Sequence, residues 1–337
     1  MVKTTQVAAD RAHDSSKTVL PVEVARGIYI ENPPSAQALK LMHLLIAKAG
    51  GRMADEVQHE MRMSSLRHIE GMRHHDRASL RALFIQLRAA VMVYDDTEAQ
   101  EEIIGGFMDE IRLDYGQEIG DTLVVKWWFG RSFRRIAAES SHWAILDRQT
   151  VFALSSKYSI LLFQHIASLV NLEHVTSKSF TIPELRALLG VEAEKLSRFA
   201  DFNRRALQPA LAEINQLSRL TLTAMPRKSG RTVASVVISW AVKPDPTAAR
   251  QELNRPRIGR KARRDGTAET PPAVFPETGS ITYSPRWLDL KRQAGCNMDN
   301  TLIATSFRRF LSERGIARDA SNIEKIFSDY CNKVGKM

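Results

Sequence analysis

The stretch of residues 181–240 constrains the fold most, because its apolar residues change from a helical to a strand period within one short segment. Thr181 and Glu184 have the spacing of a capping box, and Pro183 lies in the first turn that such a box begins. Gly190 stands where a left-handed C-cap belongs. A short helix is therefore predicted to begin after Thr181 and to end before Gly190.

A second helix is predicted after the turn at Gly190. Its apolar residues recur at a spacing close to 3.6, at Leu196, Phe199, Phe202, Ala206, Ala210 and Ile214. Its other face is polar and carries Lys195, Arg198, Asp201, Asn203, Arg204, Arg205 and Gln208. Pro209 interrupts the pattern, so the straight part of this helix is predicted to end near Leu207.

Two strands are predicted next, because apolar and polar residues alternate over residues 220–225 and again over residues 236–240. The turn between them spans residues 226–231 and carries the cations Arg227, Lys228 and Arg231. Helix, turn, helix and basic hairpin is the order of a DNA-reading winged helix. An ordinary helix pair and hairpin with solvated charges has the same pattern.

Residues 155–163, 184–191 and 199–215 resemble the iteron-binding plasmid replication initiators in residue order and in spacing. The resemblance is dense over residues 155–240, looser from about residue 35 to residue 148, and absent beyond about Lys243. Phe163 departs from the family, which more often has an aromatic with a hydroxyl group there.

The resemblance implies an α+β fold of two tandem winged helices, joined by a long helix, that binds direct repeats in a replication origin. It also implies dimers that bind an inverted-repeat operator and repress the initiator's own gene, and contacts with the host replication initiator and replicative helicase. Neither role requires catalysis. A dimeric winged-helix repressor without a role in replication stays an alternative, since it would use the same reading head.

The second helix is predicted to enter a major groove, where arginine pairs with guanine, asparagine with adenine and aspartate with cytosine. The predicted base-reading residues are Asp201, Asn203, Arg204, Arg205 and Gln208. The predicted contacts with the DNA backbone are Lys195, Arg198, Arg227, Lys228, Arg231, Arg131, Arg134 and Arg135. For the last three, which lie where aromatics and cations alternate, a solvated helix start explains the pattern equally well.

Composition and periodicity divide the chain into segments. We expect a disordered lead-in over residues 1–18, a dimerising first winged helix over 19–146, a joining helix over 147–171, the DNA-reading winged helix over 172–243, a flexible basic linker over 244–283 and a helical appendage over 284–337. Within the first domain, helices are predicted from Ser35 to Gly50, over residues 66–72, and after Asp76 through Tyr94. Strands of a hairpin are predicted over residues 103–113 and 123–129.

Charge and hydropathy are consistent with a nucleic-acid partner. The 337 residues include 48 Lys and Arg against 38 Asp and Glu, and the resulting net charge of +10 favours polyanions. No apolar run approaches the roughly 18 residues of a membrane span, and the N-terminal residues lack an apolar leader. We therefore expect a cytoplasmic protein with no membrane partner.

No cofactor, metal or catalytic site is predicted. The sequence has no His-x-His for a metal-dependent nickase, no Gly-x-x-x-x-Gly-Lys phosphate loop and no nucleophile elbow. His74 and His75 next to Asp76 suggest a metal site at first sight, but adjacent side chains of a helix point to different sides. Cys296 and Cys331 lie far apart in the sequence, without the paired spacing of a zinc site. An enzyme is therefore not expected.

Overall fold

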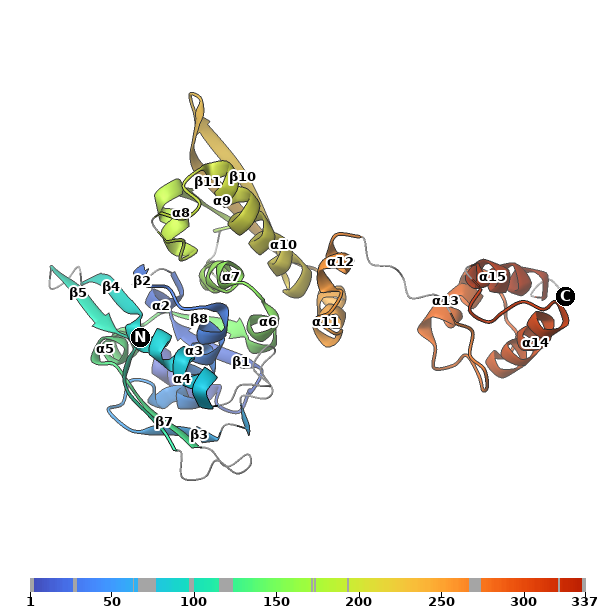
Figure 1. Ribbon diagram of the computed structural model, residues 1–337, viewed down its shortest axis with the longest axis horizontal. Helices are drawn as coiled ribbons and strands as arrows, with labels where there is room; N and C mark the ends of the chain where they lie inside the picture. The colour runs from blue at the N-terminus through green and yellow to red at the C-terminus, as the bar shows by residue number, and fades with distance from the viewer. Residues whose placement is uncertain are drawn as a thin grey trace. The chain divides into compact units, whose positions relative to one another are not determined.

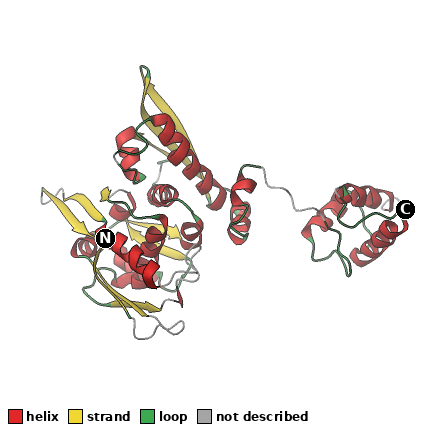
Figure 2. Ribbon diagram, in the orientation of Figure 1, coloured by secondary structure: helices red, strands yellow, loops and turns green. Residues whose placement is uncertain are grey.

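The computed structural model describes the chain except for residues 1–2, 27–28, 63, 66–76, 97–99, 115–123, 171, 173, 193, 267–273, 321 and 335–337. The chain divides into two units, Met1–Arg257 and Ile258–Met337, each with its own apolar core (Figure 1). Both units contain helices, and among the described residues strands occur only in the first unit (Figure 2). No helix in these described ranges is both long and apolar enough to cross a membrane.

The N-terminal part of the first unit contains helices and three antiparallel sheets. The helices are α1 (Thr4–Asp10), α2 (Val22–Arg26), α3 (Ala36–Ala49), η1 (Gly50–Arg52), α4 (Arg77–Ala89), α5 (Arg131–Glu139) and α6 (Arg148–Ala153). The strands are β1 (Lys17–Pro21), β2 (Tyr29–Glu31), β3 (His59–Arg62), β4 (Val91–Asp96), β5 (Glu101–Gly106), β6 (Met108–Leu113), β7 (Val124–Phe129) and β8 (Trp143–Asp147). Their pairing gives the sheets β1–β8, β2–β4–β5 and β3–β7–β6.

The rest of the first unit is a second helical layer with one sheet. Its elements are α7 (Lys157–Leu169), β9 (Ser177–Thr181), α8 (Ile182–Leu188), α9 (Phe199–Phe202), η3 (Asn203–Leu207), α10 (Gln208–Leu217), β10 (Leu220–Ser229), β11 (Thr232–Val242) and α11 (Thr247–Asn254). The strand order is β10–β11–β9, and Leu222 pairs with Trp240 across the long hairpin. Alternate residues of both strands are buried against the helices, as the sequence pattern predicts.

Two parts of the first unit share one topology. In the sheet β3–β7–β6, as in β9–β11–β10, the strand that comes last in the chain lies in the middle. α3 precedes β3 as α7 precedes β9, and α4 precedes β6 as the helical segment 199–217 precedes β10. The chain therefore contains two winged helices in tandem, and α4 is the counterpart of the segment 199–217. The β4–β5 hairpin is an insertion of the first domain.

Several predicted boundaries differ from the structure. The apolar stripe beyond Ala89 forms β4 rather than helix, because Val91, Val93 and Tyr94 favour an extended backbone. The predicted lead-in contains α1, which buries Thr4 and Ala8. The predicted helix over residues 66–72, the residues His74, His75 and Asp76, and the first residue of the predicted strand 123–129 lie outside the described residues.

The joining helix is in two pieces, α6 and α7, separated by residues 154–156. Ser156 begins α7, because its hydroxyl accepts a hydrogen bond from the amide of Tyr158 at 3.1 Å. Ser155 donates its amide and its hydroxyl to the buried carboxylate of Glu213, at 2.8 and 2.6 Å. The segment between α6 and α7 is thus hydrogen-bonded to α10.

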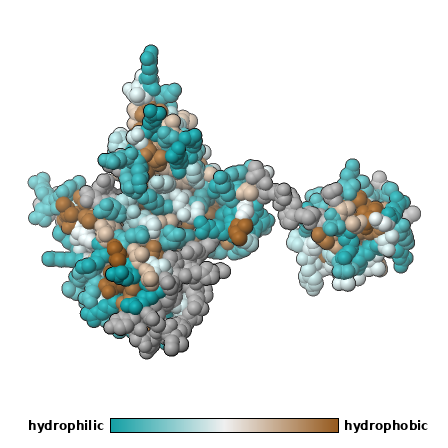
Figure 3. Space-filling view, in the orientation of Figure 1, coloured by the Kyte–Doolittle hydropathy of each residue, from teal (hydrophilic) through white to brown (hydrophobic). Residues whose placement is uncertain are grey.

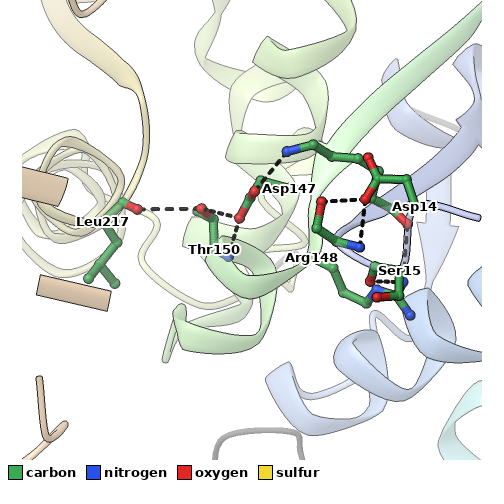
Figure 4. Close-up of polar contacts among 8 residues, drawn as sticks. Asp14, Ser15, Asp147, Arg148, Thr150 and Leu217 are labelled. Carbon is green, nitrogen blue, oxygen red and sulfur yellow. Dashed lines mark hydrogen bonds and ion pairs between the residues drawn. The ribbon is translucent and has the colours of Figure 1, made fainter. Parts of the chain in front are cut away.

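A polar network at the start of α6 also reaches α10 (Figure 4). The carboxylate of Asp147 accepts the amide of Thr150 at 2.8 Å and pairs with the ammonium of Lys17 at 2.9 Å. Burial by itself raises the pKa of Asp147, but the Thr150 amide and Lys17 outweigh it and hold that pKa below its ordinary value. The Thr150 hydroxyl lies 3.4 Å from the carbonyl oxygen of Leu217, at the end of α10. Figure 4 also shows Arg148 donating to the Ser15 carbonyl.

The second unit is helical in its described part. Its helices are α12 (Arg260–Arg264), α13 (Pro285–Gln293), α14 (Asn300–Glu313) and α15 (Ile323–Val334). Phe275, Phe307 and Phe327 form the centre of its core with Trp287, and their rings meet edge to face or tilted. This core begins before the predicted boundary at residue 284. The stretch expected to be a flexible linker contains α11 and α12, and α11 packs on α10 and α6 through the buried Ala249.

Candidate nucleic-acid interface

The turn before the predicted reading helix is held by one arginine. The capping box is present, with Thr181 accepting the Glu184 amide and Glu184 accepting the Thr181 amide. On α8, the Arg186 guanidinium donates to three carbonyl groups of the following turn, those of Glu192, Lys195 and Leu196. An arginine that bonds several carbonyls of one turn fixes the shape of that turn, because its planar fork holds the acceptors in one arrangement.

Gly190 has two separate reasons to be glycine. Its φ of +60° is left-handed, which favours glycine at a helix C-cap. A Cβ at this position would also lie 2.8 Å from Cβ of Pro33 and 3.1 Å from Cδ1 of Leu161. Pro33 belongs to the first winged helix, so the turn of the second domain rests against the first.

The reading helix begins later than predicted and changes form before its proline. Leu196 has a φ of +53° and lies in the turn, so the helical backbone begins at Phe199 rather than at Leu196. Residues 203–207 form a π-helical segment, and α10 follows with Pro209 in its first turn. A π-turn widens the helix by one residue, which accommodates the missing amide and the ring of a proline.

Base-reading candidates lie together on the outer face of this segment. Arg204, Arg205 and Gln208 are exposed, and Asp201 and Asn203 are half-buried. The Asp201 carboxylate lies 3.0 Å from the Arg204 guanidinium and 3.9 Å from that of Arg205. The Gln208 amide donates to the side-chain oxygen of Asn203 at 3.2 Å. These side chains are therefore paired with one another in the free protein.

The C-terminal end of the helix is fixed to the sheet. The Asn215 side chain donates to the carbonyl of Leu222 at 2.9 Å and accepts its amide at 2.6 Å. The Lys243 ammonium donates to the carbonyls of Asn215 and Ser218. Burial lowers the pKa of Lys243. With Glu213 bonded to Ser155, α10 is held at its end by residues from the sheet and from the joint.

The wing is longer than predicted. β10 continues through Arg227 and Lys228, which pair with β11, and the register shifts between these two residues. Only Gly230 and Arg231 form the turn. Arg227, Lys228 and Arg231 are all exposed. Figure 3 shows hydrophilic side chains over the tip of this hairpin, at the top of the view. A twisted hairpin with exposed cations can follow a phosphate backbone.

The remaining residues predicted to contact the DNA backbone differ in their exposure and in their ion pairs within the protein. Lys195 pairs with Glu192 at 2.7 Å, which raises the pKa of Lys195, and Arg198 is exposed at the start of α9. On α5, Arg131 is exposed and Arg135 pairs with Glu139 at 3.0 Å. Arg134 pairs with Glu56 at 3.4 Å and its side chain is only 14% exposed. The pair between Arg134 and Glu56 is therefore typical of a structural ion pair rather than of a DNA contact.

Another group of cations was not among the predicted site residues. Arg77, Arg81 and Arg88 lie along α4, and with Ile85 they line a groove of about 450 Å³ against β6. Arg88 donates to the Asp109 carbonyl at 3.2 Å. The spacing along the helix is visible in the sequence, but the topological equivalence of α4 with the segment 199–217 appears only once the strand order is known.

Comparisons with known proteins match both winged helices. Residues 28–167 match the family model described as Initiator Replication protein, WH1, and residues 181–240 match that described as Initiator Rep protein, WH2. Together these matches cover more than half of the chain. No curated protein matches it.

Two solved structures also match parts of the chain. One, the Pi initiator protein in complex with iteron DNA, is 17% identical with a TM-score of 0.47, and the match covers 68% of this chain and 98% of that chain. The other, domains 2 and 3 of RctB, is 10% identical with a TM-score of 0.37, and the match covers 61% of this chain and 80% of that chain.

Proposed function

We propose, because this chain belongs to the initiator Rep protein family, that it starts plasmid replication by binding direct repeats in the origin with both winged helices at once. The helical segment 199–217 and α4 are the two reading helices of this proposal. In this proposal the wing formed by β10 and β11 contacts the phosphates beside the segment 199–217.

The shared topology of the two domains is the observation that carries this proposal. A winged helix presents the helix before its hairpin to a major groove. α4 and the segment 199–217 occupy this position in their domains, and both carry exposed arginines on the side away from the core. Two such helices in one unit would reach successive grooves of one repeat.

Within each reading helix the side chains are expected to divide the work. Arg204 and Arg205 can pair bidentately with guanine, and Asn203 with adenine, so the second domain supplies base selectivity. On α4, Arg81 is exposed and lies in the middle of the helix, and Ile85 beside it is an exposed apolar residue suited to a thymine methyl group.

Hydroxyl-radical footprinting on a duplex with one repeat tests the proposal. The native chain is expected to protect two successive groove segments. Arg81→Ala should lose protection of one segment and Arg204→Ala protection of the other, each with about a tenfold or greater loss of affinity. Lys48→Ala is the matched control, since Lys48 is exposed on α3 and belongs to neither reading helix. If Arg81→Ala leaves footprint and affinity unchanged, only the second domain reads DNA.

Dimerisation and repression of its own gene belong to the same proposal. β5 is an edge strand of the sheet β2–β4–β5, and Ile104 on it is 66% exposed, which gives the first domain an apolar edge on which a second copy can pair. Sedimentation should show concentration-dependent dimers, and the species bound to an inverted repeat should be larger than the species bound to a direct repeat. A single monomeric species at high micromolar concentration on both duplexes contradicts it.

Contacts with the host replication initiator and replicative helicase complete the proposal. They rest on family membership alone. Co-purification of the full chain with each purified host protein, with and without origin DNA, tests them.

A further inference from the structure

A cleft lies where the two winged helices meet. Its volume is about 300 Å³, and its walls come from α2 and the residues before α3 in the first domain, from α7 of the joining helix, and from β9 and α8 in the second domain. α2 packs along α7 in this region (Figure 1). The apolar part of the wall includes Pro33, Leu161 and Leu188. This size is at the lower end of the range for small-molecule sites.

Two cations face this cleft from different domains. Arg26 on α2 donates Nε to the hydroxyl of Ser168 at 3.1 Å and Nη2 to its carbonyl at 3.2 Å, which fixes the guanidinium and leaves other N–H groups of the fork. Lys178 on β9 places its ammonium 5.0 Å from the centre of the Phe180 ring. Burial lowers the pKa of Lys178, and the charge of Arg26 lowers it further.

One acidic side chain, that of Glu184, also lines the cleft, so two cations face one carboxylate. Glu184 raises the pKa of Lys178 only as the third cause, after burial and Arg26. Its carboxylate accepts the Thr181 amide at 2.8 Å in the capping box and keeps its negative charge, so one positive charge of the two remains uncompensated. The two cations thus repel each other in the free protein, which leaves the cleft electropositive.

A buried histidine completes the polar lining. His165 on α7 is 1% exposed, and neither ring nitrogen has a hydrogen-bond partner of good geometry among the described residues, although the Arg26 backbone lies close enough to raise the pKa of the ring. Burial, then the charge of Lys178, lowers the pKa of His165 to about 3, and the ring is therefore neutral. A buried polar group without a partner costs stability until something supplies one.

We propose that this cleft binds a phosphate group, held between Arg26 and Lys178 with the His165 ring beside it. A phosphate relieves the repulsion between the two cations and offers oxygens to both and to the imidazole. A neutral apolar molecule of the same size would offer no acceptor to the remaining N–H groups of Arg26, to Lys178 or to the His165 ring. A metal cation would meet two positive charges.

The source of the phosphate is either a free mononucleotide or the backbone of DNA. Both supply the same oxygens. The apolar residues beside the cations suit the base or sugar of a nucleotide, and the volume of the cleft admits one. Because the walls come from both winged helices, the bound molecule would join them through contacts that neither domain makes alone.

Calorimetric titration of the full DNA-free chain with inorganic phosphate and with adenosine 5′-monophosphate, up to about 10 mM, tests the proposal. Binding of one or both is expected. Lys178→Gln should weaken it at least about tenfold and Lys178→Arg should restore most of it. Lys48→Gln, which removes the same charge from an exposed position on α3, should leave it unchanged. Lys178 is exposed at the surface, so its substitution does not threaten folding.

No binding of either probe overturns the proposal, and so does binding that Lys178→Gln and Lys48→Gln weaken equally, since such binding is a non-specific charge effect. A competing random-sequence duplex distinguishes the two sources. If the duplex displaces the bound probe, the cleft takes a phosphate of the DNA backbone. If the probe stays bound on the protein–DNA complex, the ligand is a free nucleotide, and either result supports the site.

Discussion

We expect Asp201 to reduce the attraction of the reading helix for DNA of any sequence, because its carboxylate pairs with the arginines of that helix. It pairs with Arg204 at 3.0 Å and lies 3.9 Å from Arg205, so neither arginine is a free cation before DNA arrives. Only a base that offers both arginines good acceptors, or gives Asp201 a donor, compensates for breaking these pairs. Selectivity would then come from the acid as much as from the arginines.

Asp201→Asn should therefore raise affinity for scrambled DNA by roughly 0.5–1 kcal/mol, the range of an exposed ion pair, and reduce the preference for the cognate repeat. Binding titrations on both duplexes at several salt concentrations measure this. Asp55→Asn, which removes an exposed i,i+3 pair with Arg52, is the matched control and should change neither value. Equal loss on both duplexes would mean that Asp201 only supports the helix.

Arg204→Ala and Arg231→Ala should differ in kind. The first is expected to cost roughly 1–3 kcal/mol on the cognate repeat and to relax selectivity at one base pair. The second removes a wing cation, so it should weaken all sequences alike and lower the salt slope by about one. If Arg204→Ala loses cognate and scrambled duplexes equally, Arg204 holds a phosphate and the base reader lies elsewhere.

Two buried histidines should make the fold sensitive to acid. Burial lowers the pKa of His43 to about 4, although the side chain of Gln164 acts in the opposite sense, and His165 has a pKa of about 3. Both lie below the ordinary 6.5, so the unfolded chain binds more protons and stability falls as pH drops below about 6.5, until the loss levels off below the folded values. His43 alone should contribute about 2 kcal/mol between about pH 7.5 and pH 5.

Urea unfolding at those two pH values measures the loss. His43→Leu removes the titrating group and should make stability less dependent on pH. A variant with the same pH dependence as the native chain would show that His43 is not buried in its neutral form.

Elements with strong local signals were predictable from the sequence, and those set by tertiary contacts were not. The capping box, Gly190 and the alternation along β10 and β11 are local, and each is confirmed. β9 was missed because its five residues join the sheet only through β11. The left-handed Leu196 and the π-turn before Pro209 depend on Arg186 and on packing, which no periodicity reveals.

Gly190→Ala tests the turn between α8 and α9. The left-handed φ costs about 1 kcal/mol with any Cβ, and the approach of Pro33 at 2.8 Å adds to it, so we expect a loss of about 2–3 kcal/mol in the free energy of unfolding. Gly230→Ala is the matched control: its φ is also +60°, but nothing lies within 4 Å of the added Cβ. It should cost only about 1 kcal/mol, and equal losses for both variants would show that Pro33 yields without cost.

At the scale of the whole molecule, the first unit should function without the second. A chain that ends at Arg257 keeps both winged helices and α11, so it should fold and keep its preference for the repeat. It loses the cations of α12, which should weaken all sequences alike. Ending the chain at Lys243 instead strips α11 from α10 and should lower the thermal midpoint, which circular dichroism measures. Loss of sequence preference in the longer chain would place part of the reading head in the second unit.

The candidate site was predictable only in its second half. Residues 199–231 carry both the amphipathic pattern and the family resemblance, and the exposed Arg204, Arg205 and Arg231 lie on one helix and one wing there. α4 was recognised as a core helix, but its role as a counterpart depends on pairing β3 with β7 across a large separation in sequence. Non-local strand pairing is the information that one sequence does not display.

The π-turn at residues 203–207 carries most of the residues proposed to contact DNA, and the part of α10 that follows it is bonded to the rest of the fold. Asn215, Glu213 and Lys243 hold α10 in place, and none of them is among the residues proposed to contact DNA. The outward residues can therefore be exchanged at little cost in stability. A lineage of such chains can drift to new repeats by substituting a few exposed side chains while the scaffold that aims them is inherited unchanged.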